Sequence, residues 1–319
     1  MDIGLYEDWM RPQVASLFSA QYGIKEEDFS ELIGNFYEHA FQKDKCIRII
    51  AKEGTTIIGF QSFFYWPYLL NGTTINSYQS GNSLVHPDYR GKGIFQKLLN
   101  YLDVHKDKLG IDMLIGFPID QSVGSLIRNK WLNIFNLQWF VKSGNPLSVL
   151  LPLNKKQLNK YFPDVESPDY SVNTSEFLKL SHAPAFNAWR ATHYDSSNYF
   201  SFVYKTDKDE LVLKLKTNIR KRVIKELIIG DIITTSYEPA FLSKAFDDFF
   251  KKVKKIYCIS IVSIAYNPNA DQRLSQALAL NGFKKLNKQI YFCVKPFTHN
   301  ASFTDITKWM IYRGDIDTW

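Results

Sequence analysis

The most chemically informative stretch of the chain runs from Val85 to Phe95 and reads Val-His-Pro-Asp-Tyr-Arg-Gly-Lys-Gly-Ile-Phe. A strand-like run ends at the proline, two glycines make a turn, and an amphipathic helix follows directly. The first amides of a helix have no partner within it and carry the positive end of its dipole, so they bind anions. Gly91 and Gly93 let a diphosphate approach the backbone, and Arg90 and Lys92 add positive charge. The stretch therefore predicts a phosphate-binding turn.

A bare Gly-x-Gly is weak evidence by itself, because it also occurs in tight turns that bind nothing. Two other phosphate motifs are excluded, since Gly-Lys is not followed by Ser or Thr and no third glycine precedes a ribose-binding acid. His86 is the nearest histidine to the motif. Its place at a strand end is more typical of a solvent-facing turn than of a catalytic base.

The elements that would position this turn can be predicted from the first half of the chain. Residues 77–85 alternate like a strand, and residues 94–109 repeat apolar side chains every three or four positions, which predicts a helix stopped by Gly110. Further predictions are a strand at 111–117, a hairpin at 46–51 and 55–64, and helices at 9–21 and 26–41. This order predicts an α/β domain with a central mixed sheet flanked by helices.

The second half repeats this order of elements. The predicted elements are a hairpin at 199–204 and 210–216, strands at 223–235, 256–266 and 289–294, a helix from about 241 to 253, and a helix at 270–281. Between the halves lies a segment rich in Pro, Asn, Lys and Ser. The expected organisation is a first domain at 1–145, a linker at 146–168 and a degenerate second copy at 169–319.

Composition sets outer limits on function. A hydrophobic share of 45% with 22% charged residues predicts a folded globular chain. The three cysteines form no Cys-x-x-Cys pair, so we expect neither a metal site nor a disulfide framework. No run approaches the length of a membrane span and the first residues lack a leader pattern, so we expect a cytoplasmic protein with no membrane partner. The net charge of +7 favours anionic partners in general.

Residues 90–95 resemble the acyl-coenzyme A signature of the GNAT superfamily, Arg/Gln-x-x-Gly-x-Gly/Ala, with Arg90 first and Gly93 fourth. The flanking Val-x-Pro and a downstream Leu-Leu pair also match, whereas Phe95 replaces a small residue at the sixth position. The resemblance in the order of elements continues to about Val141. It implies tandem GNAT-like domains, acetyl-coenzyme A as acyl donor, and direct transfer of the acetyl group to an amine.

The resemblance also assigns contacts to the cofactor. The amides of the turn would bind the pyrophosphate, and they belong to Arg90, Gly91, Lys92, Gly93, Ile94 and Phe95. The end of the preceding strand, at Leu84 and Val85, would pair with the pantetheine arm. Ser122 could contact the same arm, or it could cap the N-terminus of its own helix.

Acetyl transfer to an amine requires a neutral amine and a donor for the developing oxyanion. The family often supplies a Glu on the strand before the motif and a Tyr on the next helix, and neither is visible here. Gln79 and Ser83 are the candidate catalytic residues on that strand, where they could position a water. Deprotonating a lysine-like amine at pH 7 costs about 4 to 5 kcal/mol, against about 1 kcal/mol for an α-amine. We therefore expect an acceptor of low pKa, such as an amino sugar.

The corresponding passage of the second half, residues 234–240, has no glycine and carries Glu238, which would repel phosphate. By its resemblance to two-unit GNAT proteins, this half is expected to form one wall of the acceptor cleft. Some of those proteins place their terminal carboxylate in the active cleft, so Asp315, Asp317 and the Trp319 carboxylate are candidate bases. The aromatic tail could instead only dock the terminus on the core.

Three functions remain open. N-acetyl transfer to a small-molecule or saccharide amine is preferred. A tRNA-dependent aminoacyl transferase of paired GNAT-like units fits the basic run at 214–225, although an intact coenzyme A motif argues against a nucleic-acid partner. A non-catalytic acyl-coenzyme A-binding protein fits the missing Glu and Tyr. No pattern in the sequence indicates the acyl-chain length or the oligomeric state.

Overall fold

The computed structural model of the chain describes residues 1–164, 176–192 and 198–316. The strands of the first half are β1 (Asp2–Leu5), β2 (Ile47–Glu53), β3 (Thr56–Tyr65), β4 (Tyr68–Leu70), β5 (Thr73–Ile75), β6 (Ser77–Val85), β7 (Met113–Gly116) and β8 (Leu132–Ser143). Its helices are η1 (Asp8–Met10), α1 (Arg11–Tyr22), α2 (Glu26–Phe36), η2 (Pro87–Tyr89), α3 (Ile94–His105) and α4 (Asp120–Arg128).

The rest of the chain begins with η3 (Pro146–Leu150) and α5 (Lys155–Tyr161). Its strands are β9 (Lys179–Leu180), β10 (Tyr199–Lys205), β11 (Glu210–Arg220), β12 (Ile224–Thr234), β13 (Ile261–Tyr266) and β14 (Lys284–Pro296). Its other helices are α6 (Pro184–Ala191), α7 (Pro239–Val253), α8 (Gln272–Leu280), η5 (Ala301–Phe303), η6 (Ile306–Lys308) and η7 (Arg313–Asp315).

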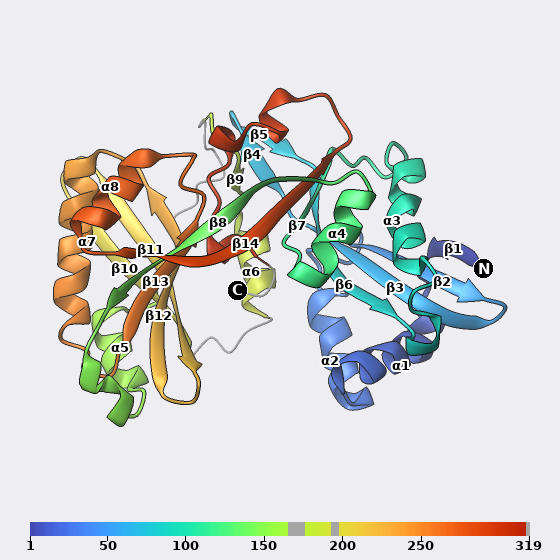
Figure 1. The fold of residues 1–319 in the computed structure, drawn as a ribbon, viewed down its shortest axis with the longest axis horizontal. Helices are drawn as coiled ribbons and strands as arrows, with labels where there is room; N and C mark the ends of the chain where they lie inside the picture. The colour runs from blue at the N-terminus through green and yellow to red at the C-terminus, as the bar shows by residue number, and fades with distance from the viewer. Residues whose placement is uncertain (165–175, 193–197, 317–319) are drawn as a thin grey trace.

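One mixed sheet runs through both halves of the described chain (Figure 1). Its strand order is β1-β2-β3-β6-β7-β14-β8-β13-β12-β11-β10. The β6–β7 and β12–β13 pairs are parallel, which requires the crossover helices α3 and α7. The mixed α/β class that the sequence predicts is confirmed.

The two halves exchange strands at the middle of this sheet. β14, the last strand of the chain, pairs with β7 on one side and with β8 on the other. β8, from the first half, in turn pairs with β13. Each half therefore completes the sheet of the other, and the tandem units share backbone hydrogen bonds and not only side-chain contacts.

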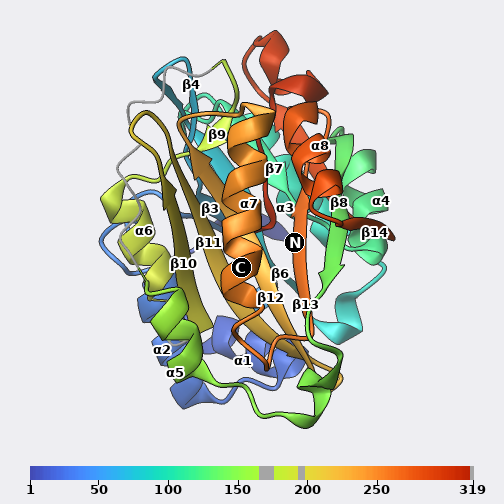
Figure 2. The same ribbon diagram turned by 90° about the vertical axis from the view of Figure 1, so that its left-hand side faces the viewer.

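Three apolar clusters hold the layers together. One lies under α1 and α2, one lies under α3 and α4, and one lies between the second half of the sheet and the pair α7 and α8. Figure 2 shows α7 and α8 lying across the face of that part of the sheet. The first cluster also takes in Phe186 and Trp189 of α6 and Trp309 near the C-terminus. These later segments therefore pack on the first half.

One expectation about local structure needs correction, and the segment between the halves contains helices. The helix predicted at 26–41 ends at Phe36, and turns follow it, because the buried Gln42 side chain bonds the backbone of Tyr65 through both its amide nitrogen and its oxygen. The segment expected as a linker at 146–168 contains η3 and α5. Leu158 and Phe162 are fully buried in the second half's cluster, so this segment is partly core.

Candidate functional site

The turn after β6 is built on two glycines with left-handed backbone. Gly91 has φ 76° and Gly93 has φ 73°, a region that favours glycine. In the described structure, the amides of residues 91–96 donate to no acceptor, and the first bond of α3 runs from Lys97 N to Gly93 O at 3.2 Å. Residues 91–93 are also exposed. A run of unpartnered N–H groups at the N-terminus of a helix can bind a diphosphate.

Arg90 has a structural part in this turn. Its amide donates to the Pro87 carbonyl at 3.2 Å, so it is not among the free amides. Its Nε donates to the Val85 carbonyl at 3.2 Å, and its Nη2 donates to Gln21 Oε1 at 2.6 Å. The side chain thereby ties the turn to the end of β6 and to α1. Lys92 stays exposed, with its Nζ 4.4 Å from the centroid of the Tyr89 ring.

The start of α3 sits close against the sheet because β3 carries a glycine under it. A Cβ on Gly59 would lie 2.9 Å from Ile94 Cγ2 and 3.2 Å from Leu98 Cδ1. Ile94 and Leu98 are buried, so the first turn of the helix cannot move away without exposing them. Gly59 thus sets the distance of this turn from the sheet.

Next to this turn, β6 and β7 diverge. Their parallel pairing covers only Ser77–Met113 to Gln79–Ile115, so the rest of β6 has no partner on that side. On its other side, the β3–β6 register shifts between Gln61 and Phe63, which puts an extra residue in β6 near Gly81. The free edge of β6 up to Leu84 and Val85 can pair with an extended ligand arm.

Polar side chains gather where the two strands separate. Both amide atoms of Gln79 are buried, with no hydrogen-bond partner in the described structure. Ser83 Oγ donates to Gln61 Oε1 at 2.5 Å, and Tyr37 OH donates to Asn82 Oδ1 at 2.6 Å. None of these groups is a base near neutral pH, and burial raises the pKa of Tyr37 well above its ordinary value. The network can orient a water or an amine but cannot hold its proton.

Residues 7–116 match the acetyltransferase (GNAT) family. This first part of the chain is a GNAT-family domain. The family carries out acyl transfer from acyl-coenzyme A to an amine, and the match gives neither the acyl group nor the acceptor. No curated protein matches the chain significantly.

Solved structures extend the likeness to nearly the whole chain. A GCN5-related N-acetyltransferase from Anabaena variabilis superposes with a TM-score of 0.62 at 12% identity, over 93% of this chain and 73% of that one. A GCN5-related N-acetyltransferase from Kribbella flavida gives a TM-score of 0.59 at 12% identity, over 92% and 72%. A tandem GNAT protein from the clavulanic acid biosynthesis pathway gives a TM-score of 0.50 at 12% identity, over 94% and 99%. Such identities show the fold alone.

Other residues near the GNAT turn make local contacts. Ser122 caps α4, because its Oγ accepts from the Ile119 amide and also lies 3.2 Å from the Ile119 carbonyl oxygen. His86 Nδ1 accepts from the Asp88 amide at 3.4 Å and lies at the protein surface. On α4, where the family often has a Tyr, Leu126 is buried and Ile127 is exposed.

In the second half, the equivalent opening between strands is filled by the protein itself. The pairing of β12 with β13 ends at Ile229–Ile264, and β12 carries a register shift next to Gly230. The segment before the C-terminus enters here. Tyr312 forms an isolated antiparallel β-bridge with Tyr266, the last residue of β13. A Cβ on Gly314 would lie 2.5 Å from the Gly230 carbonyl oxygen, so the tail backbone packs directly on β12. No ligand arm can lie at this edge while the tail occupies it.

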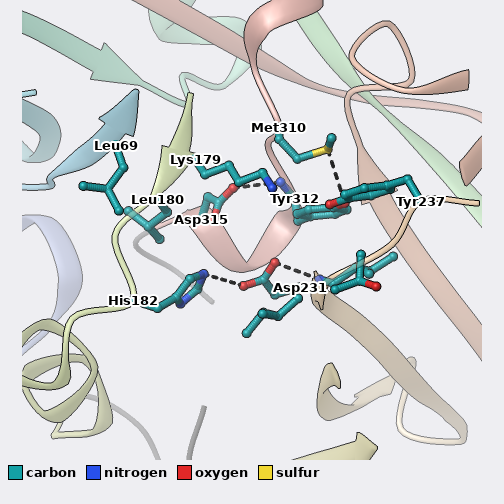
Figure 3. Close-up of a pocket in the computed structure, with 12 residues that line it drawn as sticks. Leu69, Lys179, Leu180, His182, Asp231, Tyr237, Met310, Tyr312 and Asp315 are labelled. Carbon is teal, nitrogen blue, oxygen red and sulfur yellow. Dashed lines mark hydrogen bonds and ion pairs between the residues drawn. The ribbon is translucent and has the colours of Figure 1, made fainter. Parts of the chain in front are cut away.

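A pocket lies beside this plug and is lined by both halves (Figure 3). In it, His182 Nε2 lies 2.9 Å from Asp231 Oδ2, and the Tyr312 amide donates to Asp315 Oδ2 at 2.8 Å. Burial, reinforced by repulsion from Asp231, raises the pKa of the Asp315 carboxyl to about 8. Burial opposes the charge on His182, but the Asp231 carboxylate outweighs it and raises the pKa of the imidazole. The Asp315 carboxyl can therefore exchange a proton near neutral pH.

The sequence pointed to Asp315 but not to His182 or Asp231. No local pattern joins these positions, because the tertiary structure brings the segment before α6 to the second half of β12. The predicted catalytic Asp317 and Trp319 lie outside the described residues. In the part of the chain that is described, no group of three His, Cys, Asp or Glu side chains is placed to hold a metal, and no helix is long and apolar enough to cross a membrane.

Proposed function

We propose that the chain is an acetyltransferase that uses acetyl-coenzyme A to acetylate a small-molecule amine, for example on an amino sugar. The observation that carries this proposal is the run of free amides at residues 91–96 beside the unpaired edge of β6. The amides of Gly91, Lys92, Gly93, Ile94 and Phe95 would bind the pyrophosphate. The edge at Leu84 and Val85 would pair with the pantetheine arm.

The residues fit the cofactor on two independent grounds. The amides make no hydrogen bond within the described structure, residues 91–93 are exposed to an incoming ligand, and the positive residue Lys92 stands among them. Acetyl-coenzyme A supplies an acyl group activated as a thioester, and the acceptor amine attacks it directly in a ternary complex. The buried, unpartnered amide of Gln79 would orient the amine or a water, and Ser83 would hold Gln61 in place beside it.

The side chains around the opening between β6 and β7 give the acceptor little help in losing its proton. Among the described residues, the side chains that form hydrogen bonds where β6 and β7 separate include no carboxylate or histidine. Deprotonating a lysine-like amine at pH 7 costs about 4 to 5 kcal/mol, and an amine of pKa near 8 avoids most of this cost. This supports an amino sugar or an amino-acid amine as the acceptor and disfavours protein lysine.

We further propose that residues 1–145 form the cofactor domain, that 146–168 connect it, and that 169–319 form the acceptor side. The tail that fills the second opening and the pocket of His182, Asp231 and Asp315 support this assignment, because that half offers ionisable side chains in a pocket instead of a cofactor edge. Asp317 and Trp319 stay candidate bases. Asp231→Asn should then raise KM for the amine and leave the affinity for coenzyme A unchanged.

The test is calorimetry with coenzyme A followed by a thiol-release assay with acetyl-coenzyme A and a panel of amines. We expect binding in the micromolar range and turnover that is faster with amino sugars than with lysine peptides. Binding without turnover on any amine would favour a non-catalytic acyl-coenzyme A-binding protein. No binding at all would overturn the proposal and would favour an aminoacyl transferase that uses charged tRNA.

A further inference from the structure

One edge of the second half combines exposed apolar side chains with Lys and Arg residues and has no acidic residue among them. We call it the basic edge and define it as residues 145–160, 219–225 and 254–260. Leu147, Leu150 and Tyr257 are 66%, 79% and 63% exposed. Val149, Leu151, Ile219 and Val223 are also exposed. Large apolar side chains that gather on one surface mark a contact with another apolar phase or partner.

Hydrogen bonds show that the three segments lie together. Lys225 Nζ donates to the carbonyls of Ser148 and Val149 at 3.0 and 3.2 Å, which joins η3 to the start of β12. Ile219 lies opposite Lys225 in the β11–β12 register. Asn145 Nδ2 donates to the Tyr257 carbonyl at 2.8 Å, which joins the same segment to the loop before β13. Figures 1 and 2 both place the β11–β12 turn beside residues 146–151.

The charges of the basic edge have one sign. Its three segments contain nine Lys and Arg residues and no Asp or Glu, as the sequence shows. The exposed cations are Lys156, Lys160, Lys221, Arg222, Lys254 and Lys255. Arg220 is excluded from this exposed set because it pairs with the buried Glu226.

The tip of the edge holds its cations in an uncommon backbone conformation. Lys221 and Arg222 have φ 48° and 65°, and the Val223 amide donates to the Arg220 carbonyl at 3.1 Å. Two consecutive left-handed residues in a tight hairpin loop favour Asn and Gly strongly over Lys and Arg. The sequence therefore keeps two cations at an exposed tip where smaller residues would be more stable.

We infer that the basic edge binds the surface of a membrane that contains anionic lipid, as a peripheral contact. Exposed leucines and a tyrosine can enter the interface between headgroups and acyl chains, and the surrounding cations are attracted to anionic headgroups. A second copy of this chain is a poor occupant, because it would bring the same charges face to face. The expectation of no membrane partner rested on the lack of a spanning segment, and a peripheral contact needs none.

The test is co-sedimentation of the full chain with vesicles of phosphatidylcholine, with and without 30% phosphatidylglycerol. The first variant is Lys221→Asn with Arg222→Gly, which removes two charges and gives the turn its preferred residues. The second is Leu147→Ser with Leu150→Ser. The matched control, Lys43→Asn with Lys108→Asn, removes two exposed charges from the first half.

We expect binding only to the anionic vesicles, weakened by 0.5 M salt. The turn variant should bind on the order of tenfold or more weakly, since each Lys or Arg near such a surface contributes about 1 kcal/mol. It should also melt at the same or a higher temperature, so lost binding would not reflect lost folding. The leucine variant should lose binding, and the control should keep it.

Three results would overturn the inference. The first is no binding of the wild-type chain to anionic vesicles. The second is equal binding by the two edge variants and the control. The third is light scattering that shows a dimer which the leucine variant dissociates, because the edge would then be an interface between copies. Coenzyme A affinity is measured alongside and should not change in any variant, so this inference and the proposed function can fail separately.

Discussion

A single substitution at Gly91 should separate the stability of the free protein from its affinity for coenzyme A. Gly91 has φ 76°, and a Cβ added there meets nothing within 4 Å. Asn and Asp tolerate left-handed backbone better than other side chains do. Gly91→Asp and Gly91→Asn therefore place side chains of equal size at the same point, and only the first carries a negative charge.

The two effects of the charge have opposite signs. An Asp beside the N-terminus of α3 interacts well with the helix dipole, which stabilises the free protein by about 0.3 to 1 kcal/mol relative to Asn. A phosphate bound by the same amides would lie roughly 6 Å from that carboxylate. At effective dielectric constants between 20 and 80, each unit of phosphate charge is then repelled by about 0.7 to 3 kcal/mol. We expect Gly91→Asp to bind coenzyme A about ten- to a hundredfold more weakly than Gly91→Asn.

The measurement is calorimetry with coenzyme A for both variants and the wild type, with thermal unfolding of the free proteins. Dephosphorylated pantetheine provides a control, because it lacks the pyrophosphate and should distinguish the two variants little. Equal coenzyme A affinity in the Asp and Asn variants would refute the reasoning. It would mean that the free amides of residues 91–96 do not bind the diphosphate.

Three further predictions follow from the described contacts. Gln79→Leu removes a buried amide without a partner, so it should raise the free energy of unfolding by about 1 to 3 kcal/mol. It should also lower kcat at least tenfold, and an unchanged kcat would contradict a role in orienting the acceptor. Deleting residues 317–319 should lower turnover and leave coenzyme A affinity intact, and equal turnover by the shortened chain would exclude Asp317 and Trp319 as bases. The Asp315 pKa of about 8 lies above its unfolded value near 4, so the wild type should lose stability as the pH rises from 4 to 8. Asp315→Asn should reduce this loss, measured by urea unfolding at pH 5, 7 and 9. If the free energy of unfolding changed equally with pH in both proteins, Asp315 would not be protonated in the folded protein.

The sequence alone determined the local parts of the site. The alternation of residues 77–85, the glycines at 91 and 93, and the apolar face of α3 predicted a strand, a turn and a helix, and the structure has all three at those positions. These features depend on backbone conformation and on the period of side chains along a single element. Such information lies within a few residues and can be read without knowing the rest of the fold.

The tertiary structure decided how distant segments complete one another. No pattern near Lys284–Pro296 indicates that β14 crosses to pair with β7, because strand pairing depends on register and on which edges remain open. The meeting of His182 with Asp231, the plug of Tyr312 and Gly314 in the second opening, and the basic edge arise in the same way. Each joins side chains from separate elements, and only the packing of those elements fixes the distances on which their charges and hydrogen bonds depend.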